Sequence, residues 1–143
     1  MDGIQAAVLA VKLPHLDRWL DARRRNAKRY DRILADSGLT LPTPTEHATH
    51  TYHLYVVQVP DRDEVQAKLA EADIESGIHY PTPIPLMEAY ADLGYSREDF
   101  PVAVSQMDGI LSLPMYAELS DEQIQHVCTT LMNAISRSSA ASE

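Results

Sequence analysis

The sequence of 143 residues predicts an α+β fold, in which helices cover a small antiparallel sheet of three to four strands and a long helix precedes that sheet. Between Pro14 and about Ser37, apolar side chains recur at spacings of three, four and seven, which is typical of an amphipathic helix. Three short runs, at 52–59, 75–80 and 110–114, are typical of strands. They lack the regular strand–helix alternation of a parallel sheet.

The first element is a helix over residues 4–13, whose sequence is apolar almost all round. We expect such a helix to be covered on several sides and to begin without a cap. On this basis the chain is expected to be cut from something larger. Gly38 stands where a C′ glycine would end the long helix. A connector with prolines then leads to the strand at 52–59, which is rich in β-branched and aromatic residues.

The second half begins with a helix for which Asp61 is the expected N-cap, with Glu64 completing a variant of the capping box. The next elements are a strand at 75–80, helical turns ending at Gly94, a short helix over 100–109 and a strand at 110–114. Ser120 to Gln123 form a capping box that opens the last helix. We therefore expect one domain over 1–136 and a disordered tail over 137–143.

The composition narrows the possible partners. Twelve basic against 21 acidic residues give a formal charge of −9, which disfavours binding to nucleic acid or to an anionic membrane. No apolar run approaches the roughly 18 residues of a membrane span, and the first residues do not resemble a secretory signal, so we expect a cytoplasmic protein. The basic cluster Arg23-Arg24-Arg25 has two interpretations, a solvated helix face with i,i+4 ion pairs or a patch facing an anionic partner.

Most motifs for catalysis or metal binding are missing from the sequence, including the P-loop, the dinucleotide glycine fingerprint, HExxH and CxxC. Cys128 falls on the apolar face of the last helix, which favours a core thiol over a catalytic one. His47, His50 and His53 are spaced three apart and would share one face of a helix. Their neighbours favour extended backbone instead, so we expect no metal site.

The stretch GIHYPTPIPL, residues 77–86 and here called the proline arm, contains the strongest candidates for a functional role. Its prolines exclude both a mid-helix and a central strand, and they hold the chain stiff after His79 and Tyr80. From the residues alone, His79 either closes a strand with a backbone hydrogen bond or serves a functional site. Tyr80 is by default an amphipathic packing residue.

Four collinear blocks, which reach to about Ile135, resemble the DegT/StrS family of pyridoxal-phosphate (PLP)-dependent sugar aminotransferases. They are MDGIQAAVLAVKLPHLDRWLDARRRNAKRYDRIL, HTYHLYVVQVPDRDEVQAKL, GIHYPTPIPLMEAYADLGY and FPVAVSQMDGILSLPMYAELSDEQIQHV. The resemblance implies the C-terminal small domain of a fold-type I aminotransferase, in an enzyme that transfers an amino group, typically from glutamate, to a keto sugar linked to a nucleotide. It also implies a homodimer.

The resemblance assigns substrate binding to His79 and Tyr80, because this segment reaches toward the sugar nucleotide in the family. It assigns no catalytic, cofactor-binding or metal-binding residue to this chain. Lys12, Lys28 and Lys68 do not match the family's Schiff-base motif, so we expect no PLP on this chain alone and no activity without the large domain. Residues 84–86 stand where many members have a second histidine. The alternative is a free-standing interaction or regulatory module derived from the family.

Overall fold

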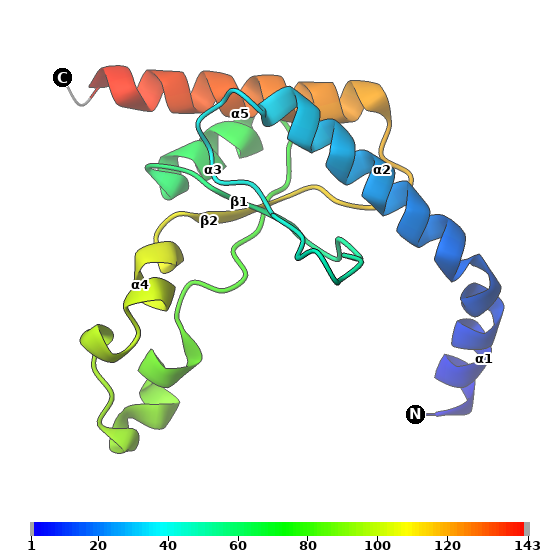
Figure 1. The fold of residues 1–143 in the computed structure, drawn as a ribbon, viewed down its shortest axis with the longest axis horizontal. Helices are drawn as coiled ribbons and strands as arrows, with labels where there is room; N and C mark the ends of the chain where they lie inside the picture. The colour runs from blue at the N-terminus through cyan, green and yellow to red at the C-terminus, as the bar shows by residue number, and fades with distance from the viewer. Residues whose placement is uncertain (1, 142–143) are drawn as a thin grey trace.

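Two strands and three helices form the core of the structure, a computed structural model that describes residues 2–141 (Figure 1). The larger elements are α1 (Gly3–Lys12), α2 (Leu16–Leu34), β1 (Tyr55–Gln58), α3 (Arg62–Glu71), α4 (Pro101–Met107), β2 (Ile110–Leu113) and α5 (Asp121–Ala141). Short 3₁₀ turns lie at Leu13–His15, Ile84–Leu86, Glu88–Leu93 and Arg97–Asp99. The order confirms the α+β class, and α2, α3 and α5 cover the same side of the two strands.

The sheet contains fewer strands than predicted. β1 and β2 pair antiparallel, with Tyr55 opposite Leu113 and Gln58 opposite Ile110. The predicted strand at 75–80 is reduced to one antiparallel bridge, between Gly77 and Ser112. On the opposite edge, Thr40 makes one bridge to Gln58. Pro42, two residues after Thr40, has no N–H to continue the ladder on that edge.

Local backbone conformation moves two predicted boundaries. β1 starts at Tyr55 rather than at residue 52, because Tyr52 has a positive φ of 49°, which interrupts extended backbone. α3 is entered through the left-handed backbone of Asp61 rather than through the predicted side-chain cap. The carbonyl of Asp61 instead accepts hydrogen bonds from the N–H groups of Glu64 and Val65.

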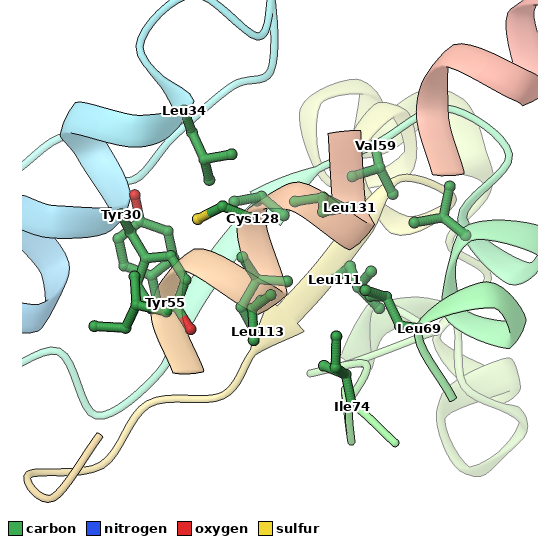
Figure 2. Close-up of a cluster of buried hydrophobic side chains, with 14 of the residues drawn as sticks. Tyr30, Leu34, Tyr55, Val59, Leu69, Ile74, Leu111, Leu113, Cys128 and Leu131 are labelled. Carbon is green, nitrogen blue, oxygen red and sulfur yellow. The ribbon is translucent and has the colours of Figure 1, made fainter. Parts of the chain in front are cut away.

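The core lies between the sheet and the covering helices (Figure 2). Tyr30 of α2 stacks on Tyr55 of β1 with ring centroids 4.7 Å apart. The Tyr55 hydroxyl donates to Asp31 at 2.7 Å, and burial with this hydrogen bond raises the pKa of Tyr55 well above its usual range. Cys128 is fully buried in the same cluster, and burial raises the pKa of its thiol to about 12. The expected core role of this cysteine is confirmed.

The first helix departs from expectation in its cap, whereas its lack of cover within this chain agrees with the expectation that the chain is cut from something larger. Asp2 caps α1 through a complete capping box with Gln5, so the helix does not begin uncapped. None of its residues is buried, so the cover expected for its apolar sides is not supplied by residues 2–141. In Figure 1, α1 and the first half of α2 project away from the core, and every buried residue of α2 lies at or after Ala22.

The last helix begins as predicted. Ser120 and Gln123 form the capping box, with the Gln123 N–H donating to Ser120 Oγ at 3.2 Å and the Ser120 N–H donating to Gln123 Oε1 at 2.9 Å. The helix continues to Ala141 and so enters the segment 137–143, for which we expected disorder. Residues 142 and 143 lie outside the described residues. No helix within 2–141 is both long and apolar enough to cross a membrane.

Three side chains of α2 donate hydrogen bonds to three consecutive backbone carbonyls of the segment that follows β2. The Tyr30 hydroxyl donates to the carbonyl of Pro114 at 2.9 Å. Arg23 donates to the carbonyl of Met115 at 2.8 Å, and Asn26 donates to that of Tyr116 at 2.9 Å. These bonds fix β2 relative to α2.

Two arginines of the basic cluster have specific hydrogen-bond partners in the structure. The guanidinium of Arg23 also donates to the carbonyls of Tyr52 and His53, at 2.9 and 3.3 Å. Arg24 donates to the His50 carbonyl and pairs with Asp21. Arg25, in contrast, is exposed. Two of the three arginines thus hydrogen-bond α2 to other segments of the same chain rather than forming only a solvated face.

We expect Arg23→Ala to lower the free energy of unfolding by about 1.5–3 kcal/mol, because charge-assisted hydrogen bonds to three carbonyls are lost. The matched control is Arg25→Ala on the same helix, which should change stability by no more than about 0.5 kcal/mol. Urea unfolding followed by circular dichroism measures both. Equal effects of the two substitutions would contradict the structural role of Arg23.

Candidate functional site

An open groove of about 810 Å³ lies between residues 72–79, β2 and the beginning of α5. Its apolar lining includes Leu113, Leu119 and Val127. Its polar lining comprises Asp73, Glu75, Ser76, His79, Ser112, Tyr116, Gln123 and His126. The groove therefore combines hydrogen-bonding side chains with an apolar surface, as ligand-binding sites commonly do.

His79 enters this groove from the start of the proline arm and is held by a side chain of β2. Its Nδ1 lies 2.9 Å from the hydroxyl of Ser112, which is 4% exposed. The backbones of Gly77 and Ser112 exchange two hydrogen bonds, of 3.1 and 2.7 Å, which bring the arm against the strand. The partner of His79 is thus a buried hydroxyl, not the backbone carbonyl that one sequence interpretation expected.

Gly77 is required by the position of this imidazole. A Cβ atom at residue 77 would lie 2.8 Å from Cε1 of His79 and 3.4 Å from its Nδ1. Non-bonded carbon atoms do not lie 2.8 Å apart, so a residue with a Cβ at position 77 would displace the ring. Gly77 therefore supplies the space in which His79 lies.

Tyr80 lies beside His79 but not among the lining residues of the groove. Its ring contacts the His79 ring edge-on, with centroids 5.4 Å apart and planes at 74°. The side chain is 74% exposed. The structure thus brings His79 into the groove and leaves Tyr80 at its margin.

The chain beyond Tyr80 carries many exposed apolar side chains. Pro83 has extended backbone, and the chain then coils through the 3₁₀ turns at Ile84–Leu86 and Glu88–Leu93. This segment projects away from the core in Figure 1. Its large exposed apolar residues are Ile84, Met87, Tyr90, Leu93, Tyr95 and Val102. Together they expose more apolar surface than the single apolar residues scattered over an ordinary protein surface.

A second, more apolar groove of about 650 Å³ lies where α1 meets α2. Trp19 lines it, and the Lys12 ammonium lies 5.8 Å from the centroid of this indole. The remaining lining residues are Leu9, Ala10, Leu13, Leu16, Leu20, Arg23, Tyr116, Ala117 and Glu118. This groove is continuous with the uncovered surface of α1.

The lysines are placed unfavourably for a PLP site in the groove of His79. Lys12 packs against Trp19, and Lys68 pairs with Glu64 on α3. Lys28 is exposed on α2. None of them lines the groove, so the residues of this chain alone do not fit the cofactor, which needs a lysine amine at its reactive carbon.

Two other histidines, His50 and His126, make local contacts. His50 Nδ1 lies 2.9 Å from the Tyr52 N–H, and its ring packs on Tyr52 with centroids 4.4 Å apart. His126 Nε2 lies 3.3 Å from the Ala72 carbonyl at the wall of the groove. Within residues 2–141, no group of three or more His, Cys, Asp or Glu side chains is arranged to hold a metal ion.

Sequence reasoning missed Ser112 and Gly77, which hold His79. A signal for Ser112 was present, because it is the single polar residue in the apolar run ILSL of β2. For Gly77 the sequence offered only its place two residues before His79, which fits many kinds of turn.

A family model and individual relatives match most of the chain. The family model described as the DegT/DnrJ/EryC1/StrS aminotransferase family matches residues 1–132. The chain is 46% identical over 132 residues to the erythromycin biosynthesis sensory transduction protein EryC1 of Saccharopolyspora erythraea, covering 92% of this chain and 36% of that protein. It is 35% identical over 127 residues to dTDP-3-amino-3,6-dideoxy-alpha-D-galactopyranose transaminase of Aneurinibacillus thermoaerophilus, covering 89% and 34%.

The fold matches a solved structure over nearly its whole length. This structure is the PMP-form of the putative sugar aminotransferase Spr1654 from Streptococcus pneumoniae, with a TM-score of 0.91 and 29% sequence identity. The match covers 99% of this chain and 37% of that protein. The chain therefore spans about a third of the length of the relatives it matches.

Proposed function

We propose, because the chain belongs to the DegT/DnrJ/EryC1/StrS aminotransferase family, that it is the C-terminal domain of a PLP-dependent nucleotide-sugar aminotransferase. The whole enzyme would move an amino group, typically from glutamate, to a keto group on a nucleotide-linked sugar. The observation that carries this proposal is the family match over residues 1–132. It is supported by a dTDP-sugar transaminase among the relatives.

In this proposal, PLP supplies the amino-transfer chemistry and the rest of the enzyme supplies the lysine that holds it. This chain contributes one wall of the substrate cleft and is inactive by itself. The support is the position of its lysines, since none of them lines the groove that contains His79.

We expect PLP and borohydride to label Lys12, Lys28 and Lys68 of the folded chain no faster than the same lysines in urea. A lysine that binds PLP specifically would react faster when folded, because neighbouring groups would hold the cofactor beside it. Absorbance and peptide mass spectrometry give the rates. Saturable labelling of one lysine in the folded chain alone would overturn the proposal that the lysine lies elsewhere.

We propose further that His79 and Tyr80 face this cleft and that His79 makes the substrate contact. His79 lines the groove and is held by Ser112 through Nδ1 alone, so Nε2 is available to a ligand. Tyr80 packs against the imidazole and limits its movement. A ring that is already held in place loses little entropy when it binds.

In the enzyme that contains this domain, His79→Ala should lower kcat/KM about 10–100-fold, equivalent to about 1.4–2.7 kcal/mol of transition-state stabilisation. Because the substitution also leaves the Ser112 hydroxyl without its partner, activity must be corrected for the folded fraction measured by thermal unfolding. Tyr80→Phe keeps the ring contact and serves as the control, with a smaller loss. If kcat/KM only follows the folded fraction, His79 does not contact substrate.

The apolar surface of α1 supports a further part of the proposal, an interface with the rest of the enzyme and with a second subunit. Its large exposed apolar residues, with those of the following turn, are Ile4, Val8, Leu9, Val11, Leu13 and Leu16. Patches of this kind on isolated domains promote association, and symmetric dimers are the commonest product.

We expect the 143-residue chain to self-associate, most simply to a dimer, because association buries this surface. Light scattering after size exclusion measures the mass. The double substitution Val11→Glu and Leu13→Glu should shift the chain to monomer, whereas Ala35→Glu at the other end of α2 should not. A wild-type chain that stays monomeric at high concentration would contradict the proposal.

The alternative function is an interaction or regulatory module, and the name of one relative, a sensory transduction protein, favours it. A regulatory domain would have to bind its signal without the catalytic part. Titration of the isolated chain with UDP- and dTDP-sugars distinguishes the two. Binding that is abolished by His79→Ala would favour a sugar-nucleotide sensor, and absence of binding favours the domain of an enzyme.

A further inference from the structure

We propose that Ser112 is a positioning residue that holds His79 as the neutral Nε2–H tautomer, so that the imidazole offers a hydrogen-bond donor to an acceptor oxygen of the ligand. The ligand part of this inference rests on the proposed function. The tautomer itself follows from contacts within the chain.

The backbone of Ser112 is already occupied, which leaves its hydroxyl for His79. Its N–H donates to the Gly77 carbonyl at 2.7 Å, and its carbonyl accepts from the Gly77 N–H at 3.1 Å. The residue is buried in the middle of β2, opposite Val56 of β1. Among residues 2–141, the hydroxyl oxygen has one hydrogen-bond partner, Nδ1 of His79 at 2.9 Å.

The direction of this hydrogen bond follows from the needs of the buried hydroxyl. A serine hydroxyl has one proton to donate, whereas a neutral imidazole has one donor nitrogen and one acceptor nitrogen. If Nδ1 carried the proton, the Ser112 proton would be buried without an acceptor, which is unfavourable. The favourable arrangement has Ser112 donating to an unprotonated Nδ1, and the imidazole proton is then on Nε2.

Gly77 keeps the ring within reach of Ser112. A Cβ at residue 77 would lie 2.8 Å from Cε1 of His79, so the imidazole packs directly on the backbone of the arm. The edge contact with Tyr80 limits the ring further. The imidazole is thus held by Ser112, by the backbone of Gly77 and by the Tyr80 ring.

The chemistry offered to a ligand is then specific. Nε2 has no hydrogen-bond partner among residues 2–141, and His79 lines the groove. An Nε2–H group donates to a keto, hydroxyl or phosphate oxygen, and it does not accept a proton while in this tautomer. The structure therefore favours a binding and orienting role for His79 over that of a general base.

The test is the ¹⁵N–¹H NMR spectrum of the imidazole rings in the ¹⁵N-histidine-labelled chain. It is recorded without ligand, well above the ordinary histidine pKa of about 6.5. We expect His79 to show an unprotonated Nδ1 and a protonated Nε2. A protonated Nδ1 in the wild-type chain overturns the proposal whatever the variants do.

Substitutions at Ser112 and Gly77, each with a matched control, test the cause of this preference. Ser112→Ala should shift the His79 tautomer ratio toward that of the exposed His47, and Ser112→Thr, which keeps a hydroxyl, should restore it. Gly77→Ala should move the His79 resonances and weaken the preference, whereas Gly3→Ala, where an added Cβ meets nothing within 4 Å, should leave them unchanged. An unchanged His79 ring spectrum in Ser112→Ala overturns the role of Ser112.

The outcome is independent of the proposed enzyme function. If the ring spectrum is as expected but His79→Ala leaves corrected kcat/KM unchanged, then Ser112 positions His79 and the substrate contact is wrong. If activity falls while the ring spectrum shows Nδ1–H, then His79 contacts substrate and the positioning by Ser112 is wrong.

Discussion

Three hydrogen bonds from α2 to successive carbonyls of residues 114–116 set the place of β2, and most of the molecule depends on this attachment. β2 pairs with β1 on one edge and with Gly77 on the other, so the strand fixed by α2 also positions the start of the proline arm. Tyr30 takes part twice, because its ring stacks on Tyr55 while its hydroxyl holds Pro114.

The alternation of side chains along β2 gives its two faces different tasks. Leu111 and Leu113 are buried in the core that α5 and α3 complete (Figure 2), and Leu113 also borders the groove. Ser112, between them, points to the opposite face of the pleated strand and meets His79. Core stability and the geometry of the candidate site therefore depend on the same short strand. A change that shifts its register would exchange the faces and damage both.

The sequence alone predicted the α+β class, both long helices and the capping box at Ser120, because each of these has a local signal in helical period or cap. The proline pattern singled out His79, and the structure places this residue in the groove. It failed where the outcome depends on distant partners. The segment 75–80 has the composition of a strand, yet its pairing depends on β2 and ends after Gly77. The left-handed backbone at Tyr52 is unusual for a tyrosine, and that at Asp61 is one that aspartate adopts more readily than most residues; neither has a signature in the sequence. Ser112 and His79 are 33 residues apart, so their contact exists only in the folded chain.

The place of α5 in the core has a consequence for synthesis on the ribosome. Ile124, Val127, Cys128, Leu131 and Ala134 all belong to the buried cluster, and they are translated after every other element that they cover. At about 5–20 residues per second, the apolar sides of α2, β1 and β2 stay open to solvent for seconds while the rest of the chain is made. At this stage the nascent chain exposes apolar surface. Molecular chaperones that bind exposed apolar segments can therefore bind it before α5 emerges.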